Sequence, residues 1–151
     1  MLRDDINNAL KNAMKAQDQR RVSTLRMVNA AFKNADIEAR GAGKGPLGDD
    51  DLRAQLQKLI KQRHESAELY DKGGRPELAT QERDEIAIIS SFMPKQMSED
   101  DVKAAVAAAV KDTGASSMKD MGRVMAALKE RYAGKMDFAK AGGLVKGQLG
   151  S

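Results

Sequence analysis

The 151-residue sequence contains no cysteine and no tryptophan, and it has a single histidine. Without cysteine the chain cannot form disulfides, thiolate metal sites or cysteine nucleophiles. One histidine, His64, excludes zinc sites with several histidine ligands and leaves one candidate for histidine-based catalysis. Only five side chains are aromatic, fewer than a single-strand nucleic-acid binder built on base stacking would use. We therefore expect no metal and no cofactor.

The sequence also lacks long apolar runs. No run approaches the roughly 20 residues that a helix needs to cross a bilayer. The first residues, Met1-Leu2-Arg3-Asp4-Asp5, are acidic where a secretion signal would be basic and then apolar. These two absences predict a protein of the cytoplasm that does not associate with membranes.

Apolar residues recur at three- and four-residue spacing through most of the sequence, which is typical of amphipathic helices. Before Pro94 this spacing predicts about four helices, with breaks at 17–19, 41–48 and 72–74. Three aspartates at 49–51 favour a helix start, because a helix N-terminus attracts negative charge. Pro94 is expected to end the fourth helix.

Three further helices are predicted after Pro94. Ser98 followed by acidic residues is typical of a capped helix start, and Thr113-Gly114 should end that helix. Apolar residues at 121–128 and 138–149 mark two more helices, and no segment alternates as a strand would. We predict an all-α protein with an N-terminal helical domain and a small three-helix domain. The predicted domains are residues 1–94 and residues 95–151.

The excess positive charge lies near the C-terminal end of the chain. There are 26 basic and 22 acidic residues, a formal charge of +4. Residues 1–113 contain 19 of each sign, whereas residues 114–151 contain 7 basic and 3 acidic residues. A concentrated basic segment offers sites for neutralising phosphates. A solvated helix surface would show the same pattern.

No group of residues assembles a catalytic site. The segment 41–45, Gly-Ala-Gly-Lys-Gly, lacks the glycine spacing of a phosphate loop and the Ser or Thr after its lysine. His64 and Ser66 are two residues apart and therefore point to different faces of a helix. Paired carboxylates such as Asp49 and Asp51 fit helix caps better than acid and base roles. We therefore expect no catalytic residues.

A polar group surrounds the turn at 72–74. Arg63 and Tyr70 are seven residues apart and share one helix face, and Arg75 follows the glycines of the turn. One interpretation is structural: Arg63 and Arg75 pair with Glu82 or Glu85 and set the angle of a helical hairpin. The other interpretation is a binding site.

Several motifs, in order along nearly the whole chain, resemble the YqeY family. They are Lys61 to Tyr70, Gly74 to Ala79, Phe92 to Ser98, Asp120 to Met125 and Val145 to Leu149, together with Thr24-Leu25-Arg26, Glu82 and Glu85-Ile86. Pro76 stands where aspartate is common in that family. The resemblance implies an N-terminal helical domain followed by a three-helix domain similar to the tail of GatB.

GatB is a subunit of the glutamine-dependent amidotransferase that acts on mischarged Glu-tRNA or Asp-tRNA, and its tail helps to hold tRNA. A related module is appended to some glutaminyl-tRNA synthetases. Family descriptions accordingly read carbon–nitrogen ligase activity with glutamine as amido-N-donor. This chain has no room for the kinase cradle, glutaminase or ammonia channel of that enzyme, so we expect the relation to extend only through the tail.

Two hypotheses follow. The first is a non-catalytic protein that binds tRNA or accompanies a tRNA amidotransferase or synthetase. In that case the phosphate contacts are expected to come from the GatB-tail-like segment, at Lys119, Arg123, Lys140 and Lys146.

The second hypothesis is a protein–protein adaptor that docks its helical hairpin on an amidotransferase or synthetase without binding RNA. Tyrosine and arginine are favoured interface anchors. The residues expected to contribute are Arg63, Tyr70, Arg75 and Glu82.

Overall fold

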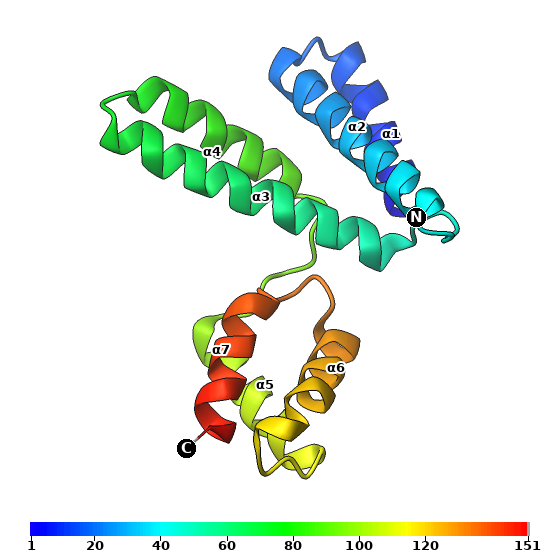
Figure 1. The fold of residues 1–151 in the computed structure, drawn as a ribbon. Helices are drawn as coiled ribbons and strands as arrows, with labels where there is room; N and C mark the ends of the chain where they lie inside the picture. Colours follow the sequence, from blue (N-terminus) through cyan, green and yellow to red (C-terminus); the bar gives the residue numbers. More distant parts are fainter. Residues whose placement is uncertain (151) are drawn as a thin grey trace. The chain divides into compact units, whose positions relative to one another are not determined.

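All regular elements in the described part of the chain, residues 1–150, are helices, which confirms the predicted all-α class (Figure 1). The structure is a computed structural model. Its helices fall into two compact units, one ending at Met93 and the other beginning at Pro94.

The first unit consists of two helical hairpins (Figure 1). Helix α1 packs along α2, and α3 packs along α4. Their bounds are α1 Leu2–Lys15, α2 Gln19–Gly41, α3 Asp49–Lys72 and α4 Pro76–Ser90. The turn between α3 and α4 contains Gly74 with a φ of +72°, a left-handed conformation that glycine adopts without steric cost.

The ends of α2 and α4 have local causes. The Asp18 carboxylate accepts a hydrogen bond of 3.2 Å from the backbone N–H of Arg21 and so caps α2. The predicted end of the fourth helix at Pro94 is wrong, because α4 ends at Ser90. The backbone N–H groups of Phe92 and Met93 bond to carbonyls only three residues back, so tighter turns replace the last helical turn.

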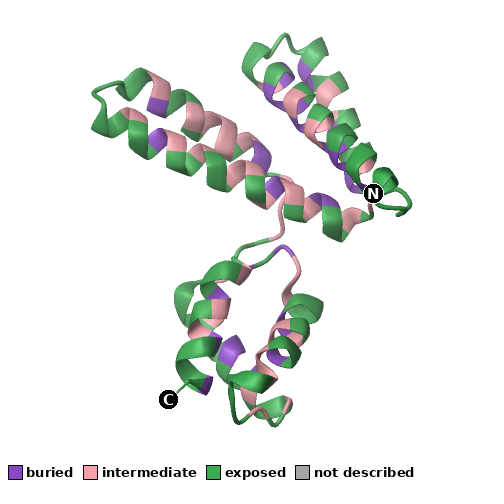
Figure 2. Ribbon diagram, in the orientation of Figure 1, coloured by how far each residue is buried: buried purple, intermediate pink, exposed green. Residues whose placement is uncertain are grey.

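The core of the first unit lies where the two hairpins meet. Its buried residues are Leu2, Ile6, Leu25, Val28, Phe32, Leu52, Leu56 and Ile89. Away from this core, only the small residues Ala67 and Ala79 are buried between the outer halves of α3 and α4 (Figure 2). Partly buried side chains of α3 and α4 include the apolar Leu59, Ile60 and Ile88 and the ion pair of Arg63 with Glu85.

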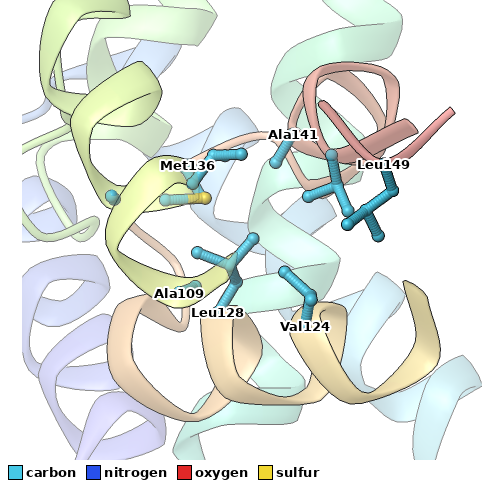
Figure 3. Packing of buried hydrophobic residues seen from close by; sticks show 9 residues of the cluster. Ala109, Val124, Leu128, Met136, Ala141 and Leu149 are labelled. Carbon is cyan, nitrogen blue, oxygen red and sulfur yellow. The ribbon is translucent and has the colours of Figure 1, made fainter. Parts of the chain in front are cut away.

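The second unit contains α5 Glu99–Asp112, the short 3-10 helix η1 Met118–Asp120, α6 Met121–Tyr132 and α7 Phe138–Leu149. Ser98 caps α5 as predicted, since its hydroxyl accepts a 3.1 Å hydrogen bond from the N–H of Asp101. The three α-helices bury one apolar cluster (Figure 3). Its members are Ala105, Val106, Ala109, Val124, Leu128, Met136, Ala141, Val145 and Leu149.

The loop from α6 to α7 is tied to the segment before α5. The backbone N–H of Met97 donates to the carbonyl of Lys135 at 2.9 Å, and the Gln96 amide donates to the carbonyl of Gly134 at 2.7 Å. These bonds hold α7 in a fixed register against α5 and α6.

Replacing Leu128 with alanine tests this core. Leu128 is fully buried, so Leu128→Ala should destabilise the second unit by about 2 to 5 kcal/mol through lost burial and a residual cavity. Leu144→Ala, at the partly buried edge, should cost clearly less. Hydrogen exchange of the α6 and α7 amides measures this unit separately, and equal losses for the two variants would contradict the described core.

Candidate nucleic-acid interface

The solvent-exposed side of helix α7 carries a line of very small residues. Ala141, Val145 and Leu149 are buried against α5 and α6. Because an α-helix has 3.6 residues per turn, Ala139, Gly143 and Gly147 fall on the opposite side, and all three are exposed; Gly150 continues the line. A Cβ atom added at Gly143 or Gly147 would meet nothing within 4 Å. Packing within the chain therefore does not require glycine at either position.

Two lysines border this line of small residues. Lys140 and Lys146 each lie about 60° around the helix from Gly143, on opposite sides. Both side chains are exposed, and neither makes an ion pair with any residue that the structure describes. The sequence-predicted pair Lys140 and Lys146 thus shares one solvent-facing surface of α7.

An open hollow of about 680 Å³ lies over the C-terminal half of α7. Its lining combines a cationic side chain, an apolar side chain and backbone: Met118, Gly143, Lys146, Gly147 and Gly150. Met118 belongs to η1 and is 42% exposed. The backbone of α7 is accessible in this hollow because its outward positions carry no side chain.

The other two predicted phosphate ligands differ from each other. Lys119 is exposed on η1 and makes no ion pair within the described chain, whereas Arg123 donates to the Asp120 carboxylate at 2.8 Å. Asp120 also accepts the backbone N–H groups of Ser116 and Ser117 at 2.9 and 3.3 Å. The pKa of Asp120 is lowered mainly by the hydrogen bond from the backbone N–H of Ser116. The backbone N–H of Ser117 and the Arg123 guanidinium lower it further. Arg123 therefore already has a partner, while Lys119, Lys140 and Lys146 do not.

Sequence reasoning missed the accessible backbone of α7 and the position of Met118. The available signal was Gly143 and Gly147 inside a predicted helix, because interior glycines weaken a helix and often have a packing or functional reason. No sequence signal predicted that η1 would bring Met118 to the same hollow.

The residues that the sequence places around the turn at 72–74 do not form one site. Arg63 on α3 is only 15% exposed, and its guanidinium donates to Glu85 at 3.1 Å. It also donates to the carbonyl of Leu59 at 3.1 Å and to the sulfur of Met27 on α2 at 3.3 Å. Arg63 therefore joins α2, α3 and α4 from inside the first unit.

Arg75 does not pair with Glu82 or Glu85, contrary to the structural interpretation of the sequence. Its guanidinium donates to Glu77 at 2.8 Å, and both side chains are 61% exposed. The reason is distance: Arg75 directly precedes α4, and Glu85 lies ten residues further, about 15 Å along a helix. Tyr70 is half-buried on α3, and its carbonyl accepts the Arg75 backbone N–H at 2.7 Å.

Glu82 has an unfavourable setting for its charge. Burial raises the pKa of Glu82, the neighbouring carboxylate of Glu85 raises it further, and the guanidinium of Arg63 partly opposes both. Glu85 holds Arg63 by a direct ion pair, whereas no ion pair of Glu82 is present within the described residues. The two glutamates, three residues apart on α4, thus have opposite expected effects on stability.

Within residues 1–150 there is no group of three or more His, Asp or Glu side chains arranged to hold a metal ion. The same residues include no helix with both the length and the apolar character needed to cross a membrane.

Nearly the whole chain, residues 3–149, matches the family model described as Yqey-like protein. Altered inheritance of mitochondria protein 41, mitochondrial, of Eremothecium gossypii is 36% identical over 84 residues, 56% of this chain and 44% of that protein. The protein of the same name from Lachancea thermotolerans is 35% identical over 89 residues, 59% of this chain and 46% of that protein. The chain spans under half the length of these curated relatives.

Substituting the two glutamates of α4 tests the account of the hairpin. Glu85→Gln should destabilise the first unit by about 1 to 3 kcal/mol, because Arg63 loses its charged partner in a poorly solvated position. Glu82→Gln should stabilise it at pH 7, because the neutral side chain avoids burial of a charge near Glu85.

The effect of Glu82 on stability depends on pH. A raised folded-state pKa destabilises the fold once the pH exceeds that pKa, so the gain from Glu82→Gln should be full at neutral pH. The gain should vanish below the ordinary glutamate pKa of about 4.3, where both states of the wild type are protonated. Urea unfolding at pH 7 and near pH 4 measures it, and a loss of stability at pH 7 would contradict the assignment.

Proposed function

Because this chain belongs to the YqeY-like family, we propose that it is a non-catalytic accessory protein that binds tRNA through its second unit. The observation that carries the proposal is the outward surface of α7, where accessible helix backbone lies between the unpaired cations Lys140 and Lys146. Lys119, which follows Met118 in η1, is a third exposed cation without an ion pair among the described residues, and Met118 itself lines the hollow. The resemblance of this segment to the GatB tail, which helps to hold tRNA, supports the same ligand.

The chemistry of the surface suits a phosphate backbone. Lysine side chains neutralise phosphates and release their counterions, which provides affinity with little sequence readout. Each interior glycine costs a helix roughly 1 kcal/mol relative to alanine. Since no described residue lies within 4 Å of a Cβ atom added at Gly143 or Gly147, close approach of a ligand is a sufficient reason for that cost. Selection among RNAs would then come from shape.

An amidotransferase or an aminoacyl-tRNA synthetase is the protein class that this proposal assigns as partner, because the resemblance to the GatB tail links the module to those enzymes. The proposal contains no carbon–nitrogen ligase step by this chain. The alternative, an adaptor that docks by its hairpin, has weaker support because Arg63 is engaged inside the first unit and Arg75 is paired with Glu77. Tyr70 and Glu82 remain the predicted contacts of that alternative.

The compartment is also part of the proposal. The sequence predicts the cytoplasm, whereas the relatives are named as mitochondrial proteins. The names of those relatives mention no ligand, and an RNA-binding role is compatible with either compartment.

Neutralising the two lysines of α7 tests the interface. Lys140→Gln/Lys146→Gln should weaken binding of labelled bulk tRNA and reduce the slope of log affinity against log salt by about 1 to 2, because two phosphate contacts are lost. The matched control is Lys103→Gln/Lys111→Gln, which removes two exposed, unpaired lysines of α5. Equal slopes for the two variants would show that only overall charge matters and would contradict the proposed surface.

Adding methyl groups to the glycines separates binding from folding. Gly143→Ala/Gly147→Ala should stabilise the second unit by about 1 to 2 kcal/mol, because both sites have open space and alanine favours helix. The same variant should bind tRNA more weakly, because the added Cβ atoms block approach to the backbone. Thermal unfolding and tRNA titration measure the two effects. Greater stability with unchanged affinity would contradict a close approach at α7.

A further inference from the structure

The solvent-facing side of α2 carries a row of cations. Arg26, Lys33 and Arg40 follow one another at intervals of seven residues, which places them on one line of the helix. All three are exposed. Ala30 and Ile37 lie nearest to this line between them, and Ile37 is 56% exposed; Asn34 and Glu38 are also exposed in this stretch. We call the line of Arg26, Lys33 and Arg40 the α2 basic strip.

The cations of the α2 basic strip form no ion pair within residues 1–150, although the charge of Arg40 contributes to the lowered pKa of Asp36. None of its three cations makes an ion pair with a residue that the structure describes, while most arginines of the first unit do. The paired arginines are Arg3, Arg20, Arg53, Arg63, Arg75 and Arg83. Arg21, on another side of α2, also makes no ion pair among the described residues, so what distinguishes the strip is the alignment of three exposed, unpaired cations on one line.

Of the two acidic residues of α2, Asp36 is already hydrogen-bonded to Arg3 and Glu38 lies away from the strip. The Asp36 carboxylate accepts hydrogen bonds from both terminal nitrogens of the Arg3 guanidinium, at 2.8 and 2.6 Å. It also accepts one from the backbone N–H of Leu47 at 3.3 Å. The hydrogen bond from Arg3 is the main cause of the lowered pKa of Asp36, and Arg40 contributes least to it. Glu38 lies about 120° around the helix from the Arg26 line.

We infer that the α2 basic strip is a second contact for an RNA backbone, separate from the surface of α7. The inference rests on the proposed function for the identity of the ligand. Fourteen residues of helix extend about 21 Å, which places three cations along a rigid line. A double-stranded nucleic acid presents roughly one negative charge per 1.7 Å of axis, so a strip of this length faces many phosphates. Each phosphate contact that the strip makes adds its own share of the salt dependence.

A membrane surface fits the same strip less well. Helices that lie in a membrane interface bury a broad apolar face containing residues such as Trp, Phe and Leu. The apolar face of α2 is turned into the core of the first unit, where Leu25, Val28 and Phe32 are buried. Ile37 is the one large apolar side chain that α2 exposes among the described residues.

The experiment uses the full chain with the substitutions Arg26→Gln/Lys33→Gln/Arg40→Gln. Binding of labelled bulk tRNA is titrated over a series of salt concentrations. The expected result is weaker binding and a salt slope reduced by about 2 to 3, with unchanged thermal unfolding because all three side chains are exposed.

The matched control removes three exposed and unpaired lysines from α3 by Lys58→Gln/Lys61→Gln/Lys72→Gln. It makes the same change in net charge away from the strip and should reduce the slope by clearly less. An equal reduction would overturn the inference, because net charge alone would then explain the effect.

The variant Lys140→Gln/Lys146→Gln, titrated in parallel, distinguishes the two proposals. A reduced slope of log affinity against log salt in both sets of variants supports both the α7 surface and the α2 basic strip as contacts. A loss only in the α7 variant overturns the strip and leaves the proposed function standing, while a loss only in the strip variant supports the strip and overturns the α7 surface. Wild-type protein that binds no tRNA overturns both. Binding to phosphatidylserine–phosphatidylcholine vesicles that the strip variant loses, without loss of tRNA binding, would assign the strip to a membrane surface.

Discussion

Burial of one apolar face of α7 against α5 and α6 determines the surface on which the proposed function depends. Once Ala141, Val145 and Leu149 point inward, the helical period places Gly143 and Gly147 outward. Lys140 and Lys146, beside that line, make no ion pair with a described residue, although the Asp137 carboxylate that caps α7 accepts the backbone N–H of Lys140 at 3.4 Å. The interface therefore needs no special loop or strained backbone, and any change that rotates α7 would remove it.

The same constraint operates in the first unit. Helix α2 buries Val28 and Phe32 in the core, so the α2 basic strip faces solvent. The contact between the hairpins also uses charge, since Arg63 reaches α2 and α4 and is held by Glu85. A partly buried ion pair contributes little net stability but strongly disfavours other arrangements, because separating its members leaves a charge unpaired. The two units thus each present cations from a helix whose opposite face is apolar.

Helix positions could be predicted from the sequence because apolar spacing, capping residues and glycine turns act locally. Ser98 and the 72–74 turn illustrate this. Two features could not be predicted from the sequence. The end of α4 at Ser90 depends on local hydrogen bonds, and the pairing of Arg75 with Glu77 depends on how far the arginine side chain reaches along the helix. Lys140 and Lys146 are predicted from the excess charge of the C-terminal segment and from its resemblance to the GatB tail. Their common surface needed the rotation of α7, which depends on tertiary packing.

The most direct test is an amide chemical-shift titration of the isotope-labelled full chain with tRNA. Binding at the accessible backbone predicts that the amides of Gly143 and Gly147 change most within the second unit, together with those of η1. Amide shifts confined to the outer halves of α3 and α4, with α7 unchanged, would contradict the account and indicate contact through the hairpin instead.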